Sequence, residues 1–282
     1  MNFKLTKTCI TAGLLLATST LSALAGPLMD RIEAGEPIRI GFSNIPVFGF
    51  PDENGTPKGF VNEITLGILN EMGYTDVEAT VTEWGGLIPG LKANRYDIIT
   101  GGMYILGARC ENIAFSEPIA KTGDSFLVPA GNPKGLNNYK DILAAEGSIL
   151  AMYSGANTVE ASRNEGLSDA QMMQLPGPTE TLAAMQGGRA DAAALTSFEA
   201  VYLAEQSDGK FEATDPNALP EWTQNWVGIG FRDADADFIE KFNAARTAYL
   251  GSDAMMEAMK QYGYVEANLP VDTTTEWACA NR

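Results

Sequence analysis

Residues 76–102, DVEATVTEWGGLIPGLKANRYDIITGG, contain the pattern of a strand, a helix and a second strand in direct succession. DVEATVTEW alternates like a strand, GLIPGLKANR is typical of a short helix with Pro89 in its first turns, and YDIITGG is typical of a buried strand. Two strands joined through a helix indicate a parallel sheet with a right-handed crossover. The stretch therefore predicts an α/β fold.

The same alternation of strands and helices continues on both sides of this stretch. Further strands are predicted at PIRIGFS (37–43), SILAMYSG (148–155), ADAAALT (190–196) and NWVGIGFRD (225–233). Helices are predicted at GFVNEITLGILNEMG (59–73), NYKDILAAEG (138–147), ANTVEASRNEG (156–166), PTETLAAMQGGR (178–189), SFEAVYLAEQ (197–206), DFIEKFNAARTAYLGS (237–252) and DAMMEAMKQYG (253–263). The chain is long enough for two such units.

The order of these segments predicts two lobes that are joined by two extended strands. DSFLVPAGN (124–132) runs between the two units, and NWVGIGFRD returns to the first. We expect the chain to cross at about residues 126–128 and again at about 227–230. The predicted division is residues 26–125 with 229–282 in lobe 1, and residues 126–228 in lobe 2.

The first 25 residues have the pattern of a secretory signal peptide. Lys4 and Lys7 precede the apolar run ITAGLLLATSTLSALA, and small residues stand at Ala23 and Ala25. The mature chain is expected to begin near Gly26 and to be a soluble periplasmic monomer. With 19 basic and 36 acidic residues the chain has a formal net charge of −17, which argues against a nucleic-acid partner.

Two cysteines, Cys110 and Cys279, remain beyond the predicted signal peptide. Two cysteines in an oxidising compartment usually pair, so we expect a disulfide between them; two unrelated buried thiols are the alternative. The sequence has no histidine and no cluster of zinc-binding spacing, so neither a metal site nor a cofactor is predicted.

Several stretches in a fixed order resemble those of a known family. They are GFPDENGTPKGF after Phe48, LIPGLKANRYDIITGGM, FSEPI, YSGAN and GRADAAAL. The chain resembles the extracellular solute-binding proteins of family 3, which serve ABC transporters of polar amino acids and related zwitterions. TEWGGLIPGLKANRYDIITGGMYILGARC, GNPKGLNNYKDI and DAAALTS are most similar to ectoine and hydroxyectoine binders. The resemblance implies the two-lobed periplasmic binding protein fold of type II, in which each lobe has a mixed, mostly parallel sheet flanked by helices.

The resemblance also implies a ligand site on lobe 1. Gly102, at the end of a predicted strand, is one expected ligand contact, and Arg109, seven residues later, is another. Amino-acid binders grip the ligand carboxylate with an arginine at that position, and a guanidinium can donate two parallel hydrogen bonds to the carboxylate. Phe48, Trp84 and Tyr104 match the aromatic box that surrounds the cationic ring in ectoine binders. For each aromatic residue taken alone, core packing is the alternative.

Lobe 2 is expected to contribute Asn157 and Thr196. Asn157 stands at a predicted helix start, where a helix cap is the alternative role. Thr196 replaces the aspartate with which α-amino-acid binders usually hold the ammonium group, which favours a different zwitterion. Ile45 replaces the glutamate of ectoine binders three residues before the first box aromatic. The candidates to compensate for this loss are Asn44, Asp52 and Glu53.

Three classes of function fit such a pair of lobes: a transport binding protein, an enzyme such as a prephenate-type dehydratase, and a sensory domain. Catalysis needs a titrating group near the substrate, and the expected ligand positions hold neither a histidine nor a carboxylate. We expect no transmembrane segment or signalling domain after the lobes, which argues against a sensory domain. The sequence therefore predicts a non-enzymatic component of an ABC importer, with a membrane permease as partner. Ectoine or hydroxyectoine is the expected ligand, and a polar or basic amino acid is the alternative.

Overall fold

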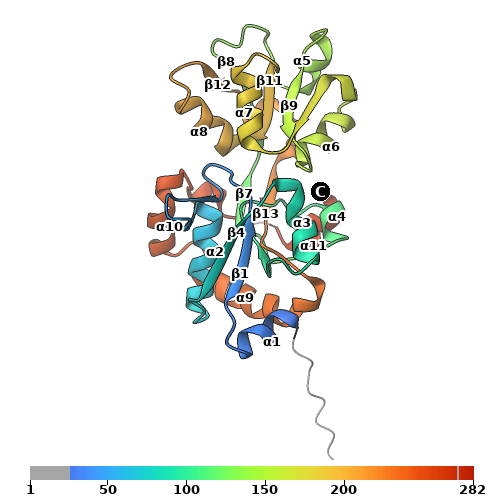
Figure 1. Ribbon diagram of the computed structural model, residues 1–282. Helices are drawn as coiled ribbons and strands as arrows, with labels where there is room; N and C mark the ends of the chain where they lie inside the picture. Colours follow the sequence, from blue (N-terminus) through green and yellow to red (C-terminus); the bar gives the residue numbers. More distant parts are fainter. Residues whose placement is uncertain (1–25, 272) are drawn as a thin grey trace, which may run out of the picture.

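The structure is a computed structural model that describes residues 26–271 and 273–282. It has two α/β lobes, and each lobe is built on a five-stranded sheet with helices around it (Figure 1). The two-lobed architecture and the mixed sheets predicted from the sequence are confirmed. The predicted signal peptide lies outside the described residues.

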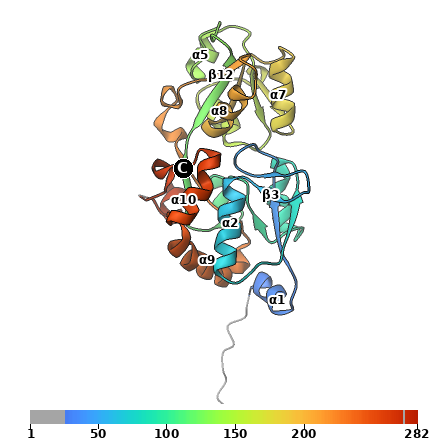
Figure 2. The same ribbon diagram turned by 90° about the vertical axis from the view of Figure 1, so that its left-hand side faces the viewer.

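The first lobe contains a sheet with the strand order β4-β1-β5-β14-β6. β1 runs parallel to β4 and β5, whereas β14 runs antiparallel to β5 and β6. Its strands are β1 (Ile38–Phe42), β4 (Val77–Val81), β5 (Ile98–Ile99), β6 (Ala114–Phe115) and β14 (Gly230–Phe231), and a hairpin adds β2 (Phe50–Pro51) and β3 (Pro57–Lys58). Its helices are α1 (Pro27–Glu33), α2 (Phe60–Glu71), α3 (Leu87–Lys92), α4 (Gly107–Cys110), α9 (Ala236–Tyr249), α10 (Asp253–Met259) and α11 (Thr275–Asn281). Helices α2 and α9 pack side by side (Figure 2).

The second lobe contains a sheet with the strand order β10-β9-β11-β8-β12. β9 runs parallel to β10 and β11, and β8 runs antiparallel to β11 and β12. Its strands are β8 (Asp124–Pro129), β9 (Leu150–Tyr153), β10 (Met172–Leu175), β11 (Ala192–Thr196) and β12 (Phe211–Ala213), and its helices are α5 (Tyr139–Ala144), α6 (Asn157–Asn164), α7 (Pro178–Gln186) and α8 (Ser197–Glu205). β9 and β11 are buried along their whole length, as strands covered on both faces must be.

Two short strands connect the lobes. β7 (Ala120–Thr122) and β13 (Asn225–Val227) pair antiparallel between the two sheets (Figure 1). Residues 126–128, which the sequence suggested as the first crossing, lie inside β8, because their apolar side chains are buried in the second lobe. The predicted strand 225–233 divides at Gly228, where a Cβ would lie 2.8 Å from the Ile105 side chain. The lobe boundaries at residues 125 and 228 stay a prediction.

Asp97 joins three neighbouring strands of the first sheet, at the amino ends of β1 and β5 and the carboxyl end of β14. Its carboxylate is 0% exposed and accepts hydrogen bonds from Arg39 in β1, at 2.8 and 3.0 Å, and from Arg232 after β14, at 3.0 Å. Burial raises the pKa of Asp97, but the hydrogen bonds from Arg39 and Arg232 outweigh it, so the pKa lies below its usual value. The carboxylate is therefore ionised and fully paired.

A disulfide ties α4 to α11. Cys110 and Cys279 are bonded, with their Cα atoms 5.8 Å apart, as the sequence predicted. The bridge fixes the C-terminal helix against the short helix that carries Arg109. In the part of the chain that the structure describes, no helix has the length and apolar character needed to cross a membrane.

Candidate functional site

A small cavity lies between the lobes, and residues of both lobes line it. Its free volume is about 10 Å³, which is roughly the space of one water molecule. The lining residues are Ile45, Phe48, Trp84, Gly101, Gly102, Tyr104, Arg109, Tyr153, Asn157 and Thr196. The structure thus brings together all seven residues that the sequence suggested as ligand contacts. Their role in binding stays a prediction.

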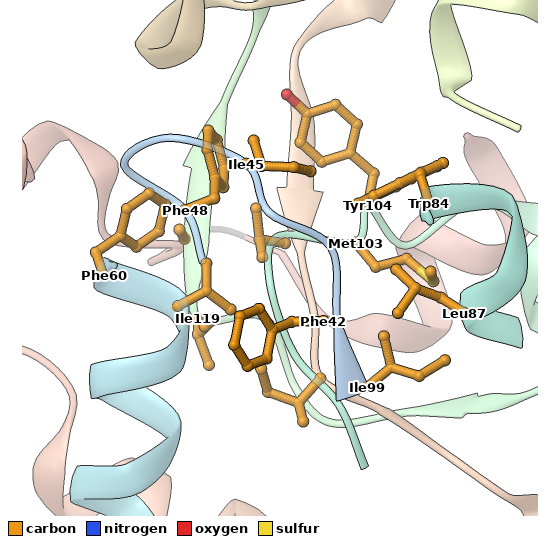
Figure 3. Close-up of a cluster of buried hydrophobic side chains, with 14 of the residues drawn as sticks. Phe42, Ile45, Phe48, Phe60, Trp84, Leu87, Ile99, Met103, Tyr104 and Ile119 are labelled. Carbon is orange, nitrogen blue, oxygen red and sulfur yellow. The ribbon is translucent and has the colours of Figure 1, made fainter. Parts of the chain in front are cut away.

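Phe48 and Gly102 form one wall of the cavity through direct packing. The Phe48 ring lies 4.8 Å from Phe60 and 5.8 Å from Phe198, measured between ring centroids. Gly102 has a φ of +102°, and a Cβ there would lie 2.4 Å from the Phe48 ring. Only glycine fits this position without strain. Phe48 therefore packs in the hydrophobic core (Figure 3). It also borders the cavity.

Trp84 connects the two lobes across the cavity. It begins a short 3₁₀ turn (Trp84–Gly86) after β4, and its indole Nε1 donates a hydrogen bond to the carbonyl oxygen of Gly155, at 3.0 Å. Its ring meets Tyr153 of β9 edge to face, with the centroids 5.8 Å apart. Gly155 belongs to the turn between β9 and α6, so this hydrogen bond holds the second lobe against the first.

Arg109 extends from α4 into the same space. Its guanidinium donates to the carbonyl oxygens of Tyr104, at 3.0 Å, and of Gly155, at 3.3 Å, and it lies 5.5 Å from the centre of the Trp84 ring. No carboxylate forms an ion pair with it among the residues that the structure describes. Burial lowers the pKa of Arg109 to about 10, which leaves the side chain charged at neutral pH. The cavity therefore has one fixed positive charge that no protein carboxylate contacts directly.

Asp124 lies directly behind the lining residues, and the sequence did not indicate it. Tyr104 Oη donates to Asp124 Oδ1 at 3.3 Å, and Asn157 Nδ2 donates to Oδ2 at 2.6 Å. Asn157 thus bonds a carboxylate and does not cap α6, whose N-cap residue is Ala156. Burial raises the pKa of Asp124 to about 7. The expected ligand positions themselves hold no carboxylate, as the sequence indicated, but a buried carboxyl group lies directly behind two of them.

Glu199 is a second buried carboxylate near the cavity. It is 0% exposed in the first turn of α8, and Tyr153 Oη donates to its Oε2 at 3.5 Å. Its Oε1 has no hydrogen-bond partner, and burial raises the pKa of Glu199 to about 8. Thr196 accepts a hydrogen bond from the Glu199 backbone N–H at 3.3 Å, so it caps α8 as well as lining the cavity. The sequence pattern T-x-x-E suggests only an exposed capping box, and this explains why Glu199 was missed.

The residues suggested as substitutes for the acid missing at Ile45 do not reach this cavity. Asp52 accepts hydrogen bonds from the backbone N–H groups of Asn54 and Thr56, both at 2.8 Å, within the β2–β3 hairpin. Glu53 is exposed in the same turn. Asn44 lines a separate, wider groove beside α8. The carboxyl groups that lie close to the cavity are those of Asp124 and Glu199 instead.

Across residues 26–271 and 273–282, no group of three or more histidine, cysteine, aspartate or glutamate side chains has an arrangement that could hold a metal ion.

The sequence profile of the bacterial extracellular solute-binding proteins, family 3, matches residues 38–264. This chain belongs to that family. A probable amino-acid ABC transporter periplasmic-binding protein of Sinorhizobium fredii is 31% identical over 266 residues, which cover 92% of this chain and 88% of the relative. An L-arginine-binding protein of Pseudomonas aeruginosa is 25% identical over 256 residues, 88% of this chain and 95% of the relative.

Solved structures place this binding protein in the same group. The crystal structure of EhuB in complex with hydroxyectoine superposes with a TM-score of 0.81 at 27% sequence identity, and covers 91% of this chain and 98% of EhuB. An arginine-binding protein of T. maritima superposes with a TM-score of 0.72 at 24% identity, which supports the fold alone. The family assignment and the two-lobed fold predicted from the sequence are therefore confirmed.

Proposed function

We propose that this protein is the periplasmic substrate-binding component of an ABC importer and that its ligand is ectoine or hydroxyectoine. The observation that carries the proposal is the lining of one interlobe cavity by Arg109 together with Phe48, Trp84 and Tyr104. The guanidinium suits the carboxylate of such a zwitterion, and the ring faces suit its delocalised cation. The likeness to the hydroxyectoine complex of EhuB supports this choice.

The cavity gives a physical route by which ligand and lobe closure are linked. Arg109 and Trp84 both donate to the carbonyl oxygen of Gly155 on the opposite lobe. A ligand needs more room than the closed cavity offers, so the lobes must separate to admit it. The ligand carboxylate then accepts hydrogen bonds from the Arg109 guanidinium in place of a backbone carbonyl oxygen. The second lobe closes on the ligand. The closed form is favoured because only it completes contacts from both lobes. We propose that a membrane permease recognises this closed monomer.

A polar or basic amino acid is the second candidate ligand. The similarity to an L-arginine-binding protein favours it, and so do the two buried carboxylates beside the cavity. We propose a transport role rather than a catalytic one for either ligand, because the relatives named above are binding proteins of transport systems or of single amino acids.

Calorimetry with a panel of zwitterions tests the proposed ligand. We expect ectoine or hydroxyectoine to bind more tightly than glutamine, histidine or arginine. Trp84→Ala should weaken that binding by about 10- to 100-fold, because it removes a ring face and a hydrogen bond between the lobes. Trp277→Ala, on the exposed face of α11, is the control and should bind like the wild type. Tightest binding of an α-amino acid, with little effect of Trp84→Ala, contradicts the proposal.

A further inference from the structure

Asp124 lies between the lobes in a position that the sequence did not suggest as functional. It begins β8, directly after the first strand that joins the lobes, and is 1% exposed. Tyr104 from the first lobe and Asn157 from the second each donate a hydrogen bond to one of its oxygens. Both donors line the cavity. Only the side chains of Tyr104 and Asn157 therefore separate the Asp124 carboxylate from the cavity.

The surroundings of Asp124 lack a cation in direct contact. Within residues 26–271 and 273–282, no lysine or arginine forms an ion pair with it, and Arg109 acts on it only at a longer distance. The titratable and polar groups around it are Tyr104, Arg109, Tyr139 of α5, Tyr153 of β9, Asn157 of α6 and Glu199 of α8. A buried carboxylate without an ion pair favours its protonated form, and burial raises the pKa of Asp124 to about 7.

We propose that Asp124 supplies the negative charge that balances the cationic group of the bound ligand, and that it releases its proton to the solvent as the ligand binds. This inference rests on the proposed function, in which the ligand carries a cationic group and a carboxylate. Arg109 offers the positive charge for the carboxylate. Ile45 and Thr196 carry no charge, so neither lining residue can balance the cation. Asp124 acts across Tyr104 and Asn157, and we class it as a positioning and charge-balancing residue.

Glu199 is less suited to this role for a structural reason. Both oxygens of Asp124 accept hydrogen bonds, which stabilise its ionised form once a cation is near. Glu199 receives only the long 3.5 Å hydrogen bond from Tyr153, and its other oxygen has no donor. Ionising Glu199 would therefore leave a buried charged oxygen unsatisfied. We expect Glu199 to keep its proton when the ligand binds.

Calorimetric titration at several pH values tests the proposal, with ectoine and hydroxyectoine as probes. Titrations at about pH 5.5, 6.5, 7.5 and 8.5, in two buffers of different ionisation enthalpy, report the protons that binding releases. For the wild type we expect up to one proton released, and affinity that rises by up to about tenfold per pH unit below pH 7 and then levels off. Asp124→Asn should release no proton, should show no such rise, and should bind at least tenfold more weakly at pH 8.5. Glu199→Gln should keep the wild-type profile.

Three results would overturn the inference. Wild-type binding without proton release, together with an Asp124→Asn affinity reduced by one factor at every pH, would show that Asp124 only holds Tyr104 and Asn157 in place. Loss of the pH dependence in Glu199→Gln but not in Asp124→Asn would assign the charge to Glu199.

Failure of both probes to bind the wild type rejects the proposed ligand alone. The same titration with L-arginine, which also carries a cationic group, then tests Asp124, and a pH-independent arginine affinity would overturn its role.

Discussion

Glu199 shows how much a single buried side chain contributes to the balance of charge around the cavity. Its carboxyl group is 0% exposed, and one of its oxygens has no hydrogen-bond partner. Burial is the largest influence on the carboxyl group and raises the pKa of Glu199 to about 8. The hydrogen bond from the Tyr153 hydroxyl lowers this pKa, and the nearby Asp124 raises it. The folded protein therefore keeps this proton at pH values where the unfolded chain has lost it.

This difference predicts how Glu199→Gln changes stability with pH. Because the folded-state pKa is raised, the wild type has its full stability below about pH 4.5 and loses part of it progressively as the pH rises to about 8. Glutamine cannot ionise, so the variant should match the wild type near pH 4.5 and exceed it at pH 9. We expect a gain of a few kcal/mol at most, since one pKa unit corresponds to about 1.4 kcal/mol.

Urea unfolding at these pH values measures the effect, and Glu205→Gln is the matched control. Glu205 lies at the exposed end of the same helix and should behave like the wild type at each pH. An equal effect of Glu199→Gln at both pH values would show that the carboxyl group does not titrate as proposed.

Short strands of the first sheet depend on side chains beyond their own hydrogen bonds. β5 has only two residues, yet it lies at the centre of the sheet between β1 and β14. Asp97, just before β5, receives hydrogen bonds from Arg39 in β1 and Arg232 after β14. The opposite end of β5 leads to Gly101 and Gly102 in the cavity lining. The ion cluster therefore fixes the strand that delivers these glycines.

Asp97→Ala should destabilise the first lobe strongly. The substitution removes an ion-pair partner from Arg31, Arg39 and Arg232, and breaking such a buried ion pair typically costs about 3–5 kcal/mol. Denaturant unfolding measures this loss, with the exposed Asp233→Ala as control. Folded Asp97→Ala protein should keep its ligand affinity within about threefold, because the cluster lies at the other end of the strands. A loss of unfolding free energy below about 1 kcal/mol would argue that the cluster does not hold β5.

At the scale of the whole molecule, two β-strands connect the lobes, and a disulfide within the first lobe closes a long loop. Cys110 and Cys279 are 169 residues apart in sequence, and the loop between them includes the entire second lobe. Cys110 directly follows Arg109 in α4. The disulfide can therefore affect both the stability of the chain and the position of the guanidinium.

Replacing both cysteines by serine should lower stability and weaken ligand binding. A closed loop of this length corresponds to about 5 kcal/mol in the chain-entropy description. Thermal unfolding in the presence of a reducing agent, with free-thiol labelling to establish reduction, checks the first effect in the wild type. Calorimetry of the double Cys110→Ser, Cys279→Ser variant checks the second. Unchanged thermal stability of fully reduced protein would contradict this prediction.

The sequence by itself determined the succession of strands and helices, the family, the disulfide and the seven residues that meet at the cavity. These features depend on local patterns: periodic apolar residues, turn glycines, and motif positions that keep their order along the chain. Short strands without alternation, such as β10, β12 and the β2–β3 hairpin, escaped prediction, because edge strands of two to four residues have too few side chains for a pattern.

Only the tertiary structure decided which carboxyl groups lie beside the cavity. Asp124 begins an otherwise apolar strand, and Glu199 occupies a turn of helix that the sequence alone would place in solvent. Asp124, at the start of β8, is buried because α6 and the segment after β5 pack around it. Glu199, near the start of α8, is buried against β9. The sequence predicted two crossing strands but placed the first at 126–128 instead of β7, and it did not indicate the contacts with Gly155 between the lobes. Burial of a carboxylate and contact between lobes depend on residues far apart in the chain, and no local period in the sequence encodes them.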